Sequence, residues 1–221
     1  MPEYELLYWP ITGLGEPIRL TFVVGGIPFK DTTPKTDETF NDRKMALHPY
    51  APDATGLPIL TVDGKAYGQS RAILRYIGRI AQYEGAPLYP TDPIEQIECD
   101  EMVELGEDLR MPILPTFRIQ DQAEKEAARA ALVAPDGGLT KFLKVLDKKL
   151  GESFPTKVNI GIIYIWCMTT MMRQPTFLDG IPPDALNAYA NITKLHQWMS
   201  NLPPIKQYYE SAEGRDNFTP L

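Results

Sequence analysis

Residues 68–76 read Gly68-Gln69-Ser70-Arg71-Ala72-Ile73-Leu74-Arg75-Tyr76, and they begin where a hairpin gives way to a helix. The pair Asp63-Gly64 is a signal for a two-residue hairpin turn, and it separates short strands expected at 59–62 and 65–67. From about Ser70 onward, apolar residues recur at helical spacing, at Ile73, Tyr76, Ile77 and Ile80. The segment therefore predicts two antiparallel strands followed directly by an amphipathic helix.

The start of this helix is a candidate anion site. Its first backbone N–H groups have no intrahelical partner and carry partial positive charge, so a carboxylate near Gln69 and Ser70 would gain hydrogen bonds and a favourable dipole. The Ser70 hydroxyl would add a further donor. Alternatively, Ser70 only caps its own helix, which is the commoner role of such a serine.

A tyrosine closes the first strand of the chain. The run Tyr4-Glu5-Leu6-Leu7-Tyr8-Trp9 predicts a strand over 4–9, and a turn at 10–15 leads to a helix expected at 16–24, with Pro17 in its first turn. The Tyr8 phenol would then lie at the carboxyl end of a strand and face a helix start, where α/β folds bind ligands. The alternative role of Tyr8 is packing, which is commoner for a tyrosine in this position.

The dipeptide Leu57-Pro58 precedes a strand that we expect in the centre of the sheet. Proline is tolerated there only at the start of the strand or in an unusual conformation. A cis bond would turn the backbone of Leu57 outward, and its N–H and C=O groups would be available to pair with a short peptide. The alternative is an ordinary trans turn, since only about 5–6% of X–Pro bonds are cis.

The rest of the chain divides by composition into two parts. Residues 1–83 read as one small α/β unit, with a further strand at 28–32 and a short helical piece at 38–46. Residues 84–93 form a linker rich in proline and glycine. Beyond the linker the chain is predicted to be all helical, with helices at 94–111, 120–132, 139–150, 158–172 and 183–199. The segment 158–172 is apolar nearly all round, so we expect it to be buried.

Composition restricts the class of function. The 221 residues carry a net charge of −7, which argues against nucleic acid or an anionic membrane as the main partner. There is no apolar run long enough to span a bilayer and no signal-like segment before the first strand, so we expect a cytoplasmic protein. Cys99 and Cys167 form no Cys-x-x-Cys motif and no disulfide framework, which suits a reducing compartment. With His48 and His196 as the only histidines, we expect no metal site.

Together these segments resemble the cytosolic glutathione transferases. The resemblance is carried by residues 4–9, 13–20, 57–60, 62–64 and 69–76; it is dense over 2–83 and thins to a pattern of helices over 93–205. Among the classes of the family, the chain looks most like sigma, which uses a tyrosine. The resemblance implies a thioredoxin-like glutathione-binding domain over 1–83, a linker at 84–93 and an all-α domain over 94–221 that contributes the electrophile site.

The resemblance also implies a role for individual residues. Tyr8 would donate a hydrogen bond to the glutathione sulfur and favour its thiolate. Leu57 would offer its backbone to the tripeptide before a cis Pro58, and Gln69 and Ser70 would hold the γ-glutamyl end. The residues implied for glutathione binding are Tyr8, Trp9, Phe40, Lys44, Leu57, Pro58, Gln69, Ser70 and Asp108.

Three of these positions lie away from the sheet edge. Phe40 matches an aromatic residue over the tripeptide, and Lys44 matches a lysine at the glycyl carboxylate, with Arg43 as the alternative if the loop is shifted by one. Asp108 matches an acid that reaches across a dimer to the ligand's amino group in the other subunit. Alternatively, Asp108 belongs to a solvated face, because its helix is acidic throughout.

The chain departs from the family pattern in three places. Leu14 stands where sigma-like enzymes often carry an arginine near the sulfur, and the lost charge weakens the electrostatic help to the thiolate. The loop at 48–56 is longer than usual. The apolar helix keeps a capping residue in Asn159 but lacks the acid three residues later, so its folding should rely more on burial.

The electrophile side is lined in the family by the turn after the first strand and by two helices. The matching positions are Ile11, Leu14, Arg110, Met111, Tyr164, Cys167 and Met168. Apolar atoms with one guanidinium imply an apolar electrophile with a polar or anionic handle. We expect Cys167 to be a buried neutral thiol rather than a nucleophile.

The resemblance thus implies a homodimeric glutathione transferase that uses glutathione as co-substrate and no metal, a detoxification enzyme that attacks apolar electrophiles. Two alternatives remain open. A related protein without turnover, in a structural or carrier role, is favoured by Leu14 and opposed by the intact Tyr8. A glutathione-dependent isomerase of the prostaglandin D synthase kind would use the same thiolate chemistry.

Overall fold

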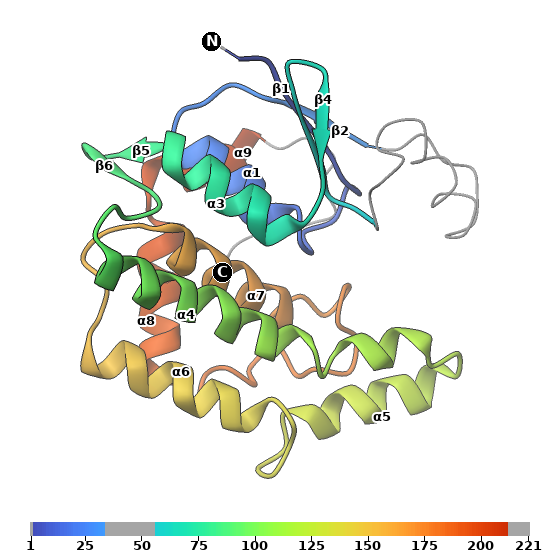
Figure 1. Cartoon of the computed structure of the whole chain (residues 1–221). Coiled ribbons are helices and arrows are strands. Elements are labelled where there is room, and N and C mark those ends of the chain that lie inside the picture. Colours follow the sequence, from blue (N-terminus) through green and yellow to red (C-terminus); the bar gives the residue numbers. More distant parts are fainter. Residues whose placement is uncertain (1, 34–55, 212–221) are drawn as a thin grey trace.

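The computed structural model describes residues 2–33 and 56–211 (Figure 1). Its elements, in chain order, are β1 (Tyr4–Leu7), α1 (Glu16–Val24), β2 (Lys30–Thr32), β3 (Ile59–Val62), β4 (Lys65–Tyr67), α3 (Ser70–Ile80), β5 (Gln82–Tyr83), β6 (Ala86–Pro87), α4 (Pro93–Arg110), the 3₁₀ helix η1 (Leu114–Arg118), α5 (Gln122–Leu132), α6 (Thr140–Glu152), α7 (Ile160–Met172), α8 (Ala190–Ser200) and α9 (Pro203–Ser211). A small mixed sheet is therefore followed by helices, as predicted.

The sheet has the strand order β2-β1-β3-β4. Strand β2 runs parallel to β1, whereas β3 is antiparallel to both β1 and β4, so β3 has the central position predicted for it. Leu6 pairs with Leu60, and both side chains enter the main core. Leu7 and Ile59 form a smaller apolar cluster, because successive residues of a strand point to opposite faces.

Helices α1 and α3 lie side by side and separate the sheet from the helical half of the chain (Figure 1). Both contact α7, which also packs against α4 and α8. Every residue of α7 is buried, which confirms the burial predicted for 158–172. Asn159 caps this helix, since its Oδ1 accepts a 2.9 Å hydrogen bond from the N–H of Ile162. None of the described helices is both long and apolar enough to cross a membrane.

Several predicted bounds were wrong at their ends. Strand β1 ends at Leu7 rather than at residue 9, and β2 begins at Lys30 rather than at residue 28. Part of the predicted linker forms the small hairpin of β5 and β6, and α9 was not predicted. The helical piece expected at 38–46 lies outside the described residues.

The largest error concerns α8, which begins at Ala190 and not at residue 183. Residues 183–188 form turns instead. The start of α8 is capped by a distant residue: Asp147 of α6 accepts hydrogen bonds of 2.8 and 3.1 Å from the N–H groups of Asn191 and Ile192. A cap supplied by another helix leaves no local signal in the sequence, which explains the error.

Candidate active site

Tyr8 follows the last residue of β1 and is buried, with 6% of its surface exposed. Its backbone N–H still donates to the C=O of Thr32, at 3.0 Å. Its hydroxyl oxygen accepts a 2.9 Å hydrogen bond from the backbone N–H of Leu14. The turn after β1 therefore folds back over the phenol and engages the acceptor side of its hydroxyl.

Two glycines make this close approach possible. A Cβ atom at Gly13 would lie 2.4 Å from the Tyr8 hydroxyl oxygen, and one at Gly15 would lie 2.3 Å from Cδ1 of the ring. Gly13 also has a φ of 39°, in the left-handed region that favours glycine. The segment Gly13-Leu14-Gly15 therefore packs closely against the Tyr8 side chain, and we call it the clasp on Tyr8.

Burial raises the pKa of the Tyr8 hydroxyl above its ordinary value. The hydrogen bond from Leu14 and the charges of Arg19 and Arg110 oppose this shift without reversing it. The phenol therefore keeps its proton at neutral pH. Because Leu14 engages the oxygen as an acceptor, the O–H is left to donate to a bound group.

The Leu57–Pro58 bond is cis, so the trans alternative is wrong. Pro58 is buried and Leu57 is half-buried, immediately before the central strand β3. Within the described part of the chain, the backbone of Leu57 makes no hydrogen bond to another backbone group. This agrees with the predicted open backbone at Leu57.

Helix α3 begins at Ser70, with Gln69 as its N-cap residue. Among the described residues no side chain caps this helix, so Ser70 does not have the capping role of the alternative. Gln69 is exposed and has a φ of 71°, an uncommon conformation for a residue other than glycine. A helix start of this kind can offer its first N–H groups to an anion, so the anion site at Gln69 and Ser70 stays a prediction.

The strand register brings these three features to one edge of the sheet. Leu7 pairs with Ile59, so the end of β1 adjoins the start of β3, where Leu57-Pro58 lies. Leu60 pairs with Tyr67, so the end of β4 and the start of α3 adjoin the same edge. The Tyr8 hydroxyl, the backbone of Leu57 and the start of α3 thus lie toward one edge of the sheet. Phe40, Arg43 and Lys44, together with the loop at 48–55, lie outside the described residues.

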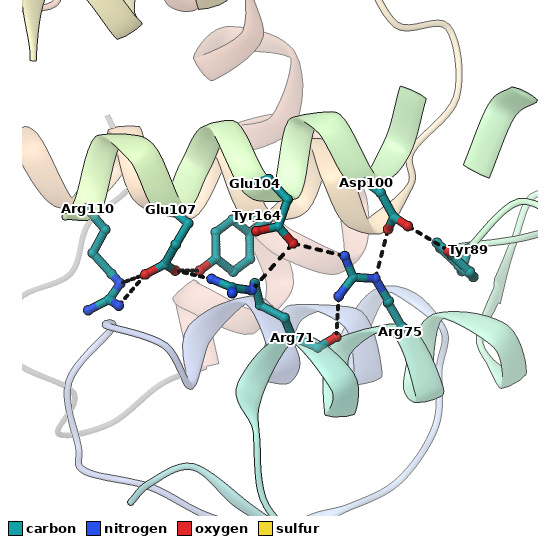
Figure 2. A network of polar contacts seen from close by, with 8 residues as sticks. All are labelled: Arg71, Arg75, Tyr89, Asp100, Glu104, Glu107, Arg110 and Tyr164. Atoms are coloured by element: carbon teal, nitrogen blue, oxygen red, sulfur yellow. Dashed lines mark hydrogen bonds and ion pairs between the residues drawn. The ribbon is translucent and has the colours of Figure 1, made fainter. Parts of the chain in front are cut away.

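A network of charges joins the start of α3 to the helical half of the chain (Figure 2). Glu107 of α4 accepts a 2.8 Å hydrogen bond from the hydroxyl of Tyr164, pairs with Arg71 at 3.0 Å, and pairs with Arg110. One turn of helix further along, Arg75 pairs with Asp100 at 2.8 Å. Sequence reasoning missed the role of Glu107, because its three partners come from three helices.

Partial burial raises the pKa of Glu107, but the hydrogen bonds from Arg110 and Tyr164 and the charge of Arg71 outweigh it, and the net direction is downward. Glu107 therefore stays ionised at neutral pH. The pKa of Tyr164 is raised, by burial first and by Glu107 second, so its hydroxyl remains a donor. Asp108, the next residue, is exposed.

The predicted electrophile residues differ in exposure. Ile11, Leu14 and Arg110 are half-buried, and Met111 is exposed. Tyr164, Cys167 and Met168 of α7 are each at most 2% exposed. Burial, with a further contribution from Glu16, raises the pKa of the Cys167 thiol well above its ordinary range, which confirms the expectation of a neutral thiol. No cluster of potential metal ligands occurs among the described residues.

Comparisons with known proteins agree with this geometry. Residues 107–212 match the family described as "Glutathione S-transferase, C-terminal domain". The chain is 32% identical over 217 residues to a glutathione S-transferase of Anopheles gambiae, covering 98% of this chain and 94% of that protein. It is 27% identical over 222 residues to the hematopoietic prostaglandin D synthase of Gallus gallus, covering 95% and 96%. The crystal structure of the glutathione S-transferase from Ascaris lumbricoides superimposes with a TM-score of 0.73 at 28% identity, covering all of both chains.

Proposed function

Because this chain belongs to the cytosolic glutathione S-transferase family, an enzyme family that uses glutathione as co-substrate, we propose that Tyr8 stabilises the glutathione thiolate for attack on an apolar electrophile. The observation that supports this most is the meeting of Tyr8, Leu57-Pro58 and the start of α3 at one sheet edge.

The chemistry requires a hydrogen-bond donor at the sulfur. A free thiol, with a pKa of about 8.5, is only a few per cent ionised at neutral pH. A positioned phenol that keeps its own proton can donate to the thiolate and shift this balance. Tyr8 suits the task, because burial raises its pKa and the N–H of Leu14 holds its oxygen in place. The partial positive charge of the Leu14 backbone N–H partly replaces the charge of the arginine that sigma-like enzymes often carry at this position.

The tripeptide lies along the sheet edge in this proposal. Its backbone pairs with Leu57, and its γ-glutamyl carboxylate binds at the start of α3, beside Gln69 and Ser70. Trp9 adjoins Tyr8 in the sequence. Phe40 would lie over the tripeptide and Lys44 would meet its glycyl carboxylate; both residues lie outside the described part of the chain.

We place the electrophile beside Ile11, Leu14, Arg110 and Met111, with Tyr164, Cys167 and Met168 forming the wall behind them. Arg110 is held by Glu107 and would face an anionic or polar handle. The half-buried apolar side chains of Ile11 and Leu14 favour an apolar electrophile.

The further assignments are proposals of the same kind. We propose a sigma-like, cytoplasmic detoxification enzyme that works as a homodimer, with Asp108 reaching the partner's ligand. Its exposure on α4 leaves it available for such a contact. We retain the division into domains at 1–83 and 94–221 with a linker between them.

A second candidate function is a glutathione-dependent isomerisation, which the similarity to the prostaglandin D synthase of Gallus gallus favours. In this reaction glutathione would be regenerated, whereas in conjugation it is consumed.

One assay tests the proposal and separates conjugation from the non-catalytic alternative. The protein is incubated with a generic aryl halide, with and without glutathione, and loss of the glutathione thiol is followed. Glutathione-dependent product with matching thiol loss supports conjugation, and its absence despite measurable glutathione binding favours the non-catalytic alternative. Ser70→Ala should weaken glutathione binding in calorimetry more than it lowers the melting temperature, and an unchanged dissociation constant would contradict the site.

A further inference from the structure

We propose that Tyr209 is a positioning residue for Tyr8 and acts through the buried pair Glu16 and Arg19. This inference rests on the proposed role of Tyr8. It connects α9, the last described helix, with the turn that clasps the catalytic phenol, across 193 residues of sequence.

The first contact joins α9 to α1. The hydroxyl of Tyr209 donates a 2.6 Å hydrogen bond to one carboxylate oxygen of Glu16. Glu16 is only 2% exposed, and its other oxygen accepts from Nη1 of Arg19 at 3.1 Å. A buried carboxylate is costly unless its oxygens are paired, so the Tyr209 hydroxyl completes this ion pair.

The second set of contacts joins Arg19 to the turn after β1. Arg19 is 2% exposed and donates to the backbone C=O groups of Trp9 and Ile11, both at 2.8 Å, and to Asp31 at 2.8 Å. The two carbonyls flank the first residue of the turn that continues into Gly13-Leu14-Gly15. The guanidinium also lies 5.5 Å from the centre of the Tyr8 ring.

The contacts form one continuous path. Tyr209 holds Glu16, Glu16 holds Arg19, and Arg19 holds the two carbonyls at the start of the turn. Leu14 at the end of the turn donates to the Tyr8 hydroxyl. Burial and the charge of Glu16 raise the pKa of Tyr209, which keeps it a donor. If the Tyr209 hydroxyl is removed, Glu16 loses a hydrogen-bond donor and its carboxylate rotates toward Arg19. The turn after β1 is then free to shift.

The test compares Tyr209→Phe with Tyr208→Phe, which removes the neighbouring hydroxyl of the same helix. The first readout needs no glutathione: the amide resonance of Leu14 in ¹H–¹⁵N spectra of the full chain. The second is the ultraviolet absorbance of bound glutathione thiolate against pH. Tyr209→Phe should move the Leu14 resonance and lower the thiolate fraction at pH 6.5 by about threefold, with the binding constant for glutathione little changed. Tyr208→Phe should leave both readouts as in the unmodified protein.

Glu16→Gln is a second variant, should Tyr209→Phe fail to fold. It keeps an acceptor for Tyr209 but removes the charge that pairs with Arg19, and it should move both readouts in the same direction. An unchanged Leu14 resonance and thiolate titration in a folded Tyr209→Phe protein would overturn the inference. If Tyr209→Phe moves the Leu14 resonance while Tyr8→Phe leaves the thiolate titration unchanged, the path of contacts is supported and the proposed role of Tyr8 is refuted. The failure of this inference and the failure of the proposed function are therefore distinguishable.

Discussion

The backbone N–H of Leu14 donates a 2.9 Å hydrogen bond to the hydroxyl oxygen of Tyr8. The phenol oxygen is the acceptor in this bond, so the hydroxyl proton remains available for donation to a bound group. Through its backbone N–H, Leu14 therefore contributes to the electrostatics of the site although its side chain carries no charge.

The clasp on Tyr8 should be sensitive to one methyl group. Gly15→Ala places a Cβ 2.3 Å from Cδ1 of the buried Tyr8 ring, so the ring must move. We expect conjugation to fall by about 10- to 100-fold, since small displacements of a catalytic group have effects of this size. The matched control is Gly138→Ala, whose Cβ would make only ordinary contacts, the nearest at 3.7 Å. Equal activity of the two variants would show that Tyr8 tolerates displacement.

His196 should make the protein sensitive to acid. It is 2% exposed, lies 2.9 Å from the Thr169 hydroxyl, and burial followed by the charge of Arg173 lowers its pKa from 6.5 to about 3. As pH falls, His196 of the unfolded chain therefore binds a proton before His196 of the folded protein does. The part of the free energy of unfolding that depends on the neutral ring is present above pH 6.5 and is lost as pH falls toward 3. The slope should be up to about 1.4 kcal/mol per pH unit. Urea unfolding at several pH values measures it. In His196→Gln the dependence should be flatter, and an identical slope in the variant would assign the acid sensitivity to other groups.

Glu107 should contribute more to stability than an exposed glutamate of the same helix. Glu107→Gln removes the charge that accepts from Arg71, Arg110 and Tyr164, and we expect a loss of about 1–3 kcal/mol in the free energy of unfolding. The control is Glu101→Gln, whose carboxylate makes a 3.1 Å surface pair with Lys149 and should contribute less than about 1 kcal/mol. Similar losses in urea titrations of the two variants would argue that the network is only a surface feature.

Asp108 should matter for ligand binding only in an assembled dimer. We expect sedimentation at micromolar concentration to give twice the mass of one chain. Asp108→Asn should weaken glutathione binding several-fold with little change in melting temperature, because the side chain is exposed. Asp136→Asn, at an exposed loop position, should change neither quantity. A monomer under these conditions would rule out the cross-subunit role.

The parts that sequence reasoning predicted correctly depend on local rules. Helix α1 and strands β3 and β4 have the predicted bounds, because proline in a first helical turn and an Asp-Gly turn are local signals. Asn159 likewise caps the helix that directly follows it.

The parts that were missed depend on partners far apart in the sequence. The start of α8 is set by Asp147 of another helix, and Arg19 has its role only because Glu16, Asp31 and the turn surround it. The contact between Tyr209 and Glu16 could not be predicted, since no pattern in either segment indicates the other. Glu16 and Arg19 stand three residues apart in a largely apolar helix, and such a charged pair is a signal that could have indicated this network.

The most direct test of the account is the titration of bound glutathione in Tyr8→Phe. The substitution keeps the ring and removes only the hydroxyl. Ultraviolet absorbance of the thiolate against pH should show a higher pKa for the bound thiol than in the unmodified protein, with glutathione affinity little changed. Conjugation at neutral pH should fall, and the loss should shrink as pH rises, because alkali then supplies the thiolate. If both the titration and the conjugation rate are the same in the two proteins, Tyr8 is a packing residue and the proposed mechanism is wrong.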